Sequence, residues 1–164
     1  MEYYATKQEF ESLYPNARSD AYDRFVWDAQ RYIDNVTTTL DGVKKLVVAF
    51  PTDEDDAETV KRCECALINA LDEVDAIRQA ATAASSYVST GNGYVSQGVR
   101  SISAGGESIT YGADAGAETD AVRAAKSASS LKQFAYSIIE SYLRGVQDAK
   151  GVNLLYGGCY PGVM

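Results

Sequence analysis

The chain has 164 residues and a net charge of −8, and it contains no histidine. This length predicts one domain with a core of its own, and a hydrophobic share of 46% excludes disorder of the whole chain. The excess of acidic residues argues against sequence-specific DNA binding, because affinity for nucleic acid comes mainly from clustered lysine and arginine.

The first half of the chain shows helical patterns. Thr6 and Glu9 have the spacing of a capping box, in which each side chain satisfies a backbone N–H at the start of a helix. A second helix begins at Ser19 or Asp20, and three consecutive β-branched threonines end it within residues 37–40. The helices predicted here cover residues 6–14, 20–40, 43–50 and 55–86.

The helix over residues 55–86 is the longest that the pattern predicts. Its apolar residues recur at spacings of three and four, which is typical of a helix-packing stripe. Cys63 and Cys65 lie roughly 200° apart around the helix axis, so they cannot bind one metal ion together. The stripe consists of Val60, Cys63, Leu67, Ala70, Val74, Ile77, Ala81 and Ala84.

A β-hairpin follows over about residues 98–112. Ile102 and Ile109 each alternate with polar residues, and Gly105 and Gly106 between them form the predicted turn. A single hairpin on a helical body predicts a protruding arm, and glycine-containing joints before and after it would let the arm change its angle. Ordinary loops explain the same glycines.

The last predicted helix runs from about Glu118 to Val146, and an apolar, aromatic tail follows over residues 151–164. Such a tail either docks on another protein or folds back over the core, and the sequence leaves both open. The predicted fold is therefore mainly α: about four helices over residues 6–90 and 117–147, a protruding hairpin arm and an extended C-terminal tail.

The sequence contains few residue patterns that are typical of catalysis or of ligand binding. Without histidine, Ser-His and Cys-His nucleophiles are excluded, and no phosphate-binding loop follows Gly105 and Gly106. The acidic run over residues 53–56 lacks the spacing of a calcium loop and is better explained as a solvated helix start. An enzyme would need a carboxylate pair such as Glu73 and Asp75 in one pocket. We therefore predict no catalytic residues, no metal site and no cofactor.

The order of these parts resembles the head-tail connector proteins of long-tailed bacteriophages, also called adaptor or head-completion proteins. The resemblance rests on four stretches taken together: Tyr4-Ala-Thr-Lys-Gln-Glu-Phe10, Val60-Lys-Arg-Cys-Glu-Cys-Ala-Leu67, the hairpin over residues 101–112, and Gly151-Val-Asn-Leu-Leu-Tyr156.

The resemblance implies a structural protein of the phage neck. Copies form a ring, expected to be dodecameric, that docks on the portal protein, extends the DNA channel and carries the next neck or tail protein. DNA passes through without sequence-specific binding. The residues assigned to portal or inter-subunit contact are Ile102, Gly105, Gly106, Ile109, Tyr111, Leu154, Leu155, Tyr156 and Tyr160.

The resemblance implies the virion neck as the location. Synthesis in the host cytoplasm is expected because the sequence has neither a signal-peptide pattern nor an apolar run of about 18 residues. No membrane partner is expected. The alternative is a small acidic helical adaptor or regulatory protein of the host cytoplasm. That alternative predicts a folded-back tail and no affinity for a portal.

Overall fold

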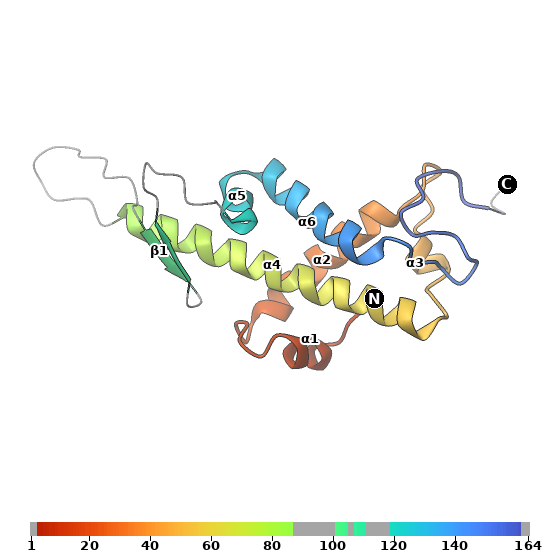
Figure 1. Cartoon of the computed structure of the whole chain (residues 1–164), viewed down its shortest axis with the longest axis horizontal. Helices are drawn as coiled ribbons and strands as arrows, with labels where there is room; N and C mark the ends of the chain where they lie inside the picture. Colours follow the sequence, from red (N-terminus) through yellow and green to blue (C-terminus); the bar gives the residue numbers. More distant parts are fainter. Residues whose placement is uncertain (1–2, 87–100, 105–106, 111–118, 162–164) are drawn as a thin grey trace, which may run out of the picture. The chain divides into compact units, whose positions relative to one another are not determined.

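The computed structural model describes residues 3–86, 101–104, 107–110 and 119–161, which form six helices and two short strands (Figure 1). The fold is mainly α, as predicted, with more helices than the expected four. The elements are α1 (Lys7–Leu13), α2 (Ala21–Thr37), α3 (Lys45–Val48), α4 (Glu54–Ser86), β1 (Ser101–Ala104), β2 (Glu107–Thr110), α5 (Asp120–Lys126) and α6 (Ala128–Leu143).

The chain divides into two compact units, one made of Met1–Leu71 and Ala135–Met164, the other of Asp72–Phe134. The first unit contains α1, α2, α3, the first part of α4 and the end of α6. Side chains that are almost completely buried make up its core: Ala5, Phe10, Val26, Ala29, Ile33, Leu46, Val60, Cys63, Cys65, Leu67, Ile68, Ile139, Leu143 and Leu154.

The predicted capping box begins α1. The Thr6 hydroxyl accepts the backbone N–H of Glu9, and the Glu9 carboxylate accepts the backbone N–H of Thr6 at 2.6 Å. Two N–H groups that the first helical turn leaves without partners are thereby satisfied. Phe10 is the buried side chain of this short helix.

The threonines end α2 where the sequence predicts. The hydroxyls of Thr37 and Thr38 donate back to the carbonyl oxygens of Ile33 and Asp34, at 2.9 Å and 2.6 Å. Such bonds compete with the helix, and the backbone of Thr38 is already extended. The loop that follows turns at Gly42, whose positive φ of 81° favours glycine, and it leads into α3.

The long helix α4 begins at Glu54, one residue before the predicted start. The carboxylate of Asp53 accepts the backbone N–H groups of Asp55 and Asp56, so the acidic run caps the helix as expected of a helix start. The predicted stripe is buried at Val60, Cys63, Leu67, Ala70, Val74 and Ile77. Ala81 is only half-buried, and Ala84 lies outside the described side chains.

In the second unit, Arg78 of α4 holds the end of α5. Its guanidinium donates to the carbonyl oxygens of Ala124 and Ala125, at 3.3 Å and 3.1 Å. These carbonyls belong to the last turn of a helix, where they have no partner within the helix itself. Val122 and Ala124 are the buried side chains of α5.

The strands β1 and β2 pair antiparallel, with Ile102 opposite Ile109 and Ser101 opposite Thr110. The predicted turn at Gly105 and Gly106 and the two flanking joints lie outside the described residues. The protruding arm therefore stays a prediction.

The last predicted helix is divided into two helices in the structure. Instead of a single helix from Glu118 to Val146, α5 ends at Lys126 and α6 begins at Ala128. Ser127 between them is extended, and its hydroxyl accepts the backbone N–H of Ser130 at 3.1 Å, so it caps α6. No helix of the described residues is long and apolar enough to cross a bilayer.

Candidate functional site

The tail after α6 folds back, which corrects the expectation of an extended tail. Gly145 has a φ of 92° and turns the chain out of the helix. Leu154 then donates its backbone N–H to Val146 at 2.9 Å, and Asp148 donates to Val152 at 2.9 Å. Of the two possibilities left open by the sequence, the structure shows the folded-back tail.

Lys45 of α3 holds this tail in place. Its ammonium group donates to the carbonyl oxygens of Asn153, Leu154 and Tyr156, at 3.0 Å, 2.8 Å and 2.5 Å. The side chain is fully buried, and burial lowers the pKa of the ammonium group, an effect that the nearby charge of Asp148 opposes. A buried cation thus binds a bend of the tail backbone through all three of its donors.

Tyr160 is the second anchor of the tail. Its hydroxyl donates to the Asp148 carboxylate at 2.5 Å, and its backbone N–H donates to the Asp41 carboxylate at 3.3 Å. Burial, together with the Asp148 carboxylate, raises the pKa of Tyr160 to about 12. The other oxygen of Asp148 accepts the backbone N–H groups of Lys150 and Val152, so this carboxylate organises the whole bend.

Near this anchored tail, large apolar side chains are exposed. Four of the seven such side chains among the described residues come from the loop before α3, from α3 itself and from the tail. We call them the α3 surface: Leu40, Val47, Val48 and Tyr156, with exposed fractions of 83%, 62%, 56% and 53%. Lys45 links the segments, because it begins α3, binds the Tyr156 carbonyl and lies 5.9 Å from the Tyr156 ring centre.

The predicted contact residues of the tail therefore divide into two kinds. Leu154 and Tyr160 are buried, with exposed fractions of 0% and 2%, and they hold the tail to the body. Tyr156 is exposed and Leu155 is half-buried. Among the described residues of the tail, Tyr156 is the large apolar side chain that is exposed for a partner.

The predicted contact residues of the hairpin are described less completely. Ile102 and Ile109 face each other across the ladder. Gly105, Gly106 and Tyr111 lie outside the described residues. Hairpin and tail belong to different compact units of the chain.

Of the four residues of the α3 surface, Tyr156 was among the predicted contact residues, whereas Leu40, Val47 and Val48 were not. Leu40 fell at the end of the helix predicted over residues 20–40, where it looked like part of the apolar face, but α2 ends at Thr37. Val47 and Val48 are neighbours in a short helix that buries Lys45 and Leu46 instead. The sequence did hold a signal, because even a helix over the predicted residues 43–50 cannot bury Leu46, Val47 and Val48 on one face when consecutive residues lie about 100° apart around the axis.

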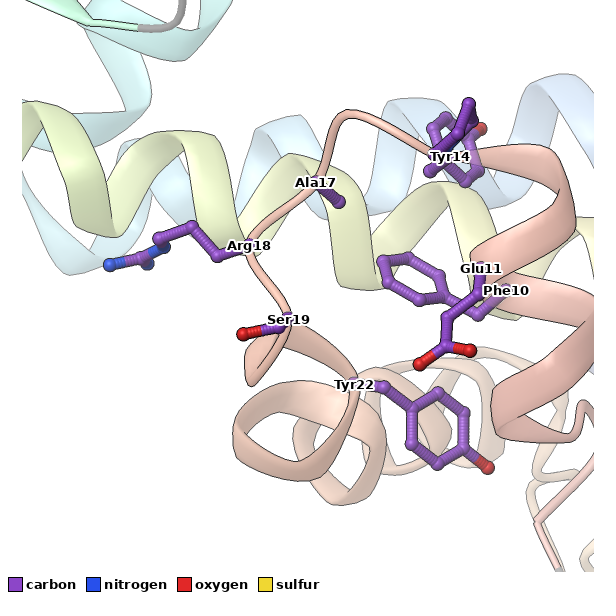
Figure 2. A pocket seen from close by; sticks show the side chains of 8 residues that line it. Phe10, Glu11, Tyr14, Ala17, Arg18, Ser19 and Tyr22 are labelled. Atoms are coloured by element: carbon purple, nitrogen blue, oxygen red, sulfur yellow. The ribbon is translucent and has the colours of Figure 1, made fainter.

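A hollow of about 310 Å³ lies between α1 and the start of α2 (Figure 2). The rings of Phe10, Tyr14 and Tyr22 line it, and Phe10 lies 5.7 Å and 6.0 Å from the other two ring centres. Glu11 and Arg18 are the only charged residues of the lining. The lining holds a single carboxylate, that of Glu11, and so does not contain the carboxylate pair considered for an enzyme in the sequence.

Metal-binding groups are also absent from the described part of the chain, where no three histidine, cysteine or acidic side chains come together. Within the acidic run, Asp53 caps α4, and Asp56 accepts the backbone N–H of Gln147 at 3.0 Å. Cys63 and Cys65 are buried thiols whose pKa burial raises to about 12, so both remain protonated at neutral pH.

Comparison with known proteins found no match: no family model, no curated protein and no solved structure resembles this chain closely enough to be reported.

Proposed function

We propose that the protein is a structural component of a bacteriophage neck, a connector whose copies form a ring on the portal protein and carry the next neck or tail protein. The proposal is supported by the order of sequence motifs described above. It is also supported by the α3 surface, because exposed apolar side chains are typical of protein–protein contact sites.

The α3 surface is the side that we assign to the portal protein. The motif resemblance attributes portal contact to the tail, and Tyr156, the exposed large apolar side chain among the described tail residues, belongs to this surface. Aromatic residues supply much of the binding energy at protein interfaces. Leu154 and Tyr160 act indirectly, because they hold the backbone on which Tyr156 is displayed.

The acidic charge suits a channel through which DNA must slide. A net charge of −8 disfavours tight contact with phosphates, so a ring of such subunits lets the genome pass. The ring itself and its predicted twelve-fold symmetry belong to the proposal.

A second function is favoured by one observation. The buried tail is what a small acidic adaptor or regulatory protein of the host cytoplasm predicts, since such a protein has no need of an extended docking segment. The two functions differ in one measurable property, affinity for a portal.

The test is co-sedimentation of the purified chain with DNA-filled, tailless heads that carry the portal protein. The connector proposal predicts saturable binding of about twelve copies per head, set by the expected ring symmetry. No binding would overturn it and leave the adaptor as the better account. Truncation after Gly151 is a poor probe, because it removes Leu154 and Tyr160 from the core.

A further inference from the structure

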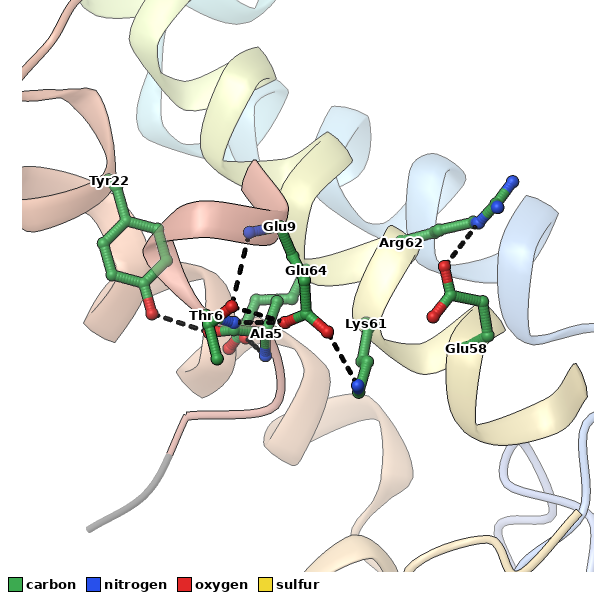
Figure 3. Close-up of polar contacts among 8 residues, drawn as sticks. All are labelled: Ala5, Thr6, Glu9, Tyr22, Glu58, Lys61, Arg62 and Glu64. Atoms are coloured by element: carbon green, nitrogen blue, oxygen red, sulfur yellow. Dashed lines mark hydrogen bonds and ion pairs between the residues drawn. The ribbon is translucent and has the colours of Figure 1, made fainter. Parts of the chain in front are cut away.

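Glu64 of α4 carries a carboxyl group that lies within the first compact unit (Figure 3). Its side chain is fully buried in α4. The Oε2 atom accepts the backbone N–H of Ala5 at 2.6 Å, whereas Oε1 is buried with no hydrogen-bond partner among the described residues. A carboxylate in this position loses its water and receives incomplete compensation, so its charged form is disfavoured.

Residues 3–6, here called segment 3–6, cover Glu64. Ala5 is 1% exposed, and its carbonyl oxygen accepts the hydroxyl of Tyr22 at 2.6 Å (Figure 3). Tyr4 donates its hydroxyl to Asp34 of α2 at 2.5 Å. Segment 3–6 is thus attached to α2 at two points and to α4 through Glu64.

Other carboxylates face the same region, but each has its own cation. Glu9 of α1 is bound by Lys61 at 2.7 Å, and Asp34 of α2 is bound by Lys44 at 3.3 Å. The structure records no cation on Glu64 within the described residues. The negative charges of Glu9 and Asp34 therefore add to the cost of ionising Glu64.

The remaining titratable neighbours stay neutral near pH 7. Burial raises the pKa of Tyr22, Cys63 and Cys65 to about 12 and also raises that of Tyr4. For Glu64 burial dominates over the backbone bonds of Ala5 and Tyr4, and the pKa rises to about 7. Among these neighbours, Glu64 is the group whose charge changes close to neutrality.

We propose that Glu64 makes the attachment of segment 3–6 dependent on pH: the segment is held closed while Glu64 is protonated, and it opens more often once Glu64 is ionised. Opening lets water reach the carboxylate, which removes the cost of keeping a charge in the core. This pH-dependent attachment does not involve the residues assigned to portal contact, so the proposal applies to a connector and to an adaptor alike.

The direction follows from linkage. With a pKa of about 7 when closed and an ordinary value of 4.5 when hydrated, Glu64 binds a proton more tightly in the closed state. The closed state is therefore favoured at acid pH, and this advantage is lost as the pH rises through about 7. These two values give an opening constant about 70-fold larger at pH 8 than at pH 5.

Hydrogen exchange of the Ala5 amide measures the opening directly, after correction for the intrinsic effect of pH. In the wild-type protein we expect protection to fall by about 70-fold between pH 5 and pH 8. In Glu64→Gln, which cannot ionise, protection of Ala5 should be nearly constant. An equal pH dependence in both proteins would overturn the proposal.

Two further variants distinguish the effect of Glu64 ionisation from a general weakening of the contacts of segment 3–6. Tyr22→Phe removes the hydroxyl that binds Ala5, so protection should fall by a similar factor at every pH while its pH dependence remains. Glu140→Gln changes an exposed carboxylate of α6 and should behave as the wild type. A flat profile in either variant would contradict the assignment to Glu64.

A direct titration does not depend on any variant folding. The carboxyl carbon of Glu64, followed by NMR in the wild-type protein, should titrate near pH 7. Titration near the ordinary value of 4.5 would overturn the proposal.

Discussion

The ammonium group of Lys45 donates a hydrogen bond to the carbonyl oxygen of Leu154 at 2.8 Å, across 109 positions of sequence, and both side chains are fully buried. A lysine on a short helix thereby fixes the course of a tail that has no regular secondary structure. Because the ammonium group has three donors and binds three carbonyl oxygens, the tail is held by its backbone as well as by its side chains.

Lys45→Met should therefore release the tail. The variant removes all three donors and leaves buried carbonyl oxygens without partners, which is expected to cost about 2–4 kcal/mol of unfolding free energy. Denaturant unfolding measures the loss, and limited proteolysis after Lys150 should become faster. Lys132→Met, at an exposed lysine of α6, is the control and should change stability by less than about 0.5 kcal/mol. Equal stability of the two variants would show that Lys45 does not hold the tail.

Tyr160→Phe tests the second anchor. The change removes the hydroxyl that Asp148 accepts, so one oxygen of a buried carboxylate loses its donor while the ring still fills the same space. We expect a loss of about 1–2 kcal/mol in thermal or denaturant unfolding. Tyr142→Phe is the matched control, since no hydrogen bond of that hydroxyl is recorded among the described residues. If both variants were as stable as the wild type, the Tyr160 bond would contribute nothing.

Thr6→Ala removes half of the capping box of α1. The backbone N–H of Glu9 loses its acceptor, and the expected cost is about 1 kcal/mol. Ser12→Ala lies on the same helix at an exposed position and should be neutral or slightly stabilising, because alanine favours helix. Urea midpoints of the two variants provide the comparison, and the prediction fails if Ser12→Ala is the more destabilised.

Much of the helical fold could be predicted because its signals are local. The capping box at Thr6, the threonines that end α2 and the apolar stripe of α4 each act over a few neighbouring residues. The structure confirms the first two, and it confirms the stripe as far as Ile77. Ser127 was missed because a lone serine caps a helix without the glutamate of a capping box, so the pattern of α5 and α6 looked continuous.

The candidate site could be predicted only in part, since its decisive contacts join distant positions. Nothing near Lys45 in sequence shows that its ammonium group is buried against residues 153–156. The same is true of Glu64, whose partner Ala5 lies 59 positions away. A lysine and a glutamate on helices ordinarily lie in solvent, and tertiary packing placed both in the core.

The central claim, that this chain docks on a phage portal, is tested most directly by pelleting three proteins with DNA-filled, tailless heads. The wild type should bind, and so should Leu13→Glu, which places a charge at an exposed apolar position outside the α3 surface. The double variant Val47→Glu, Val48→Glu should remain folded, because both side chains are more than half exposed, and it should lose binding at least tenfold. Failure of the wild type to bind would contradict the connector function, and equal binding by all three would contradict the role of the α3 surface.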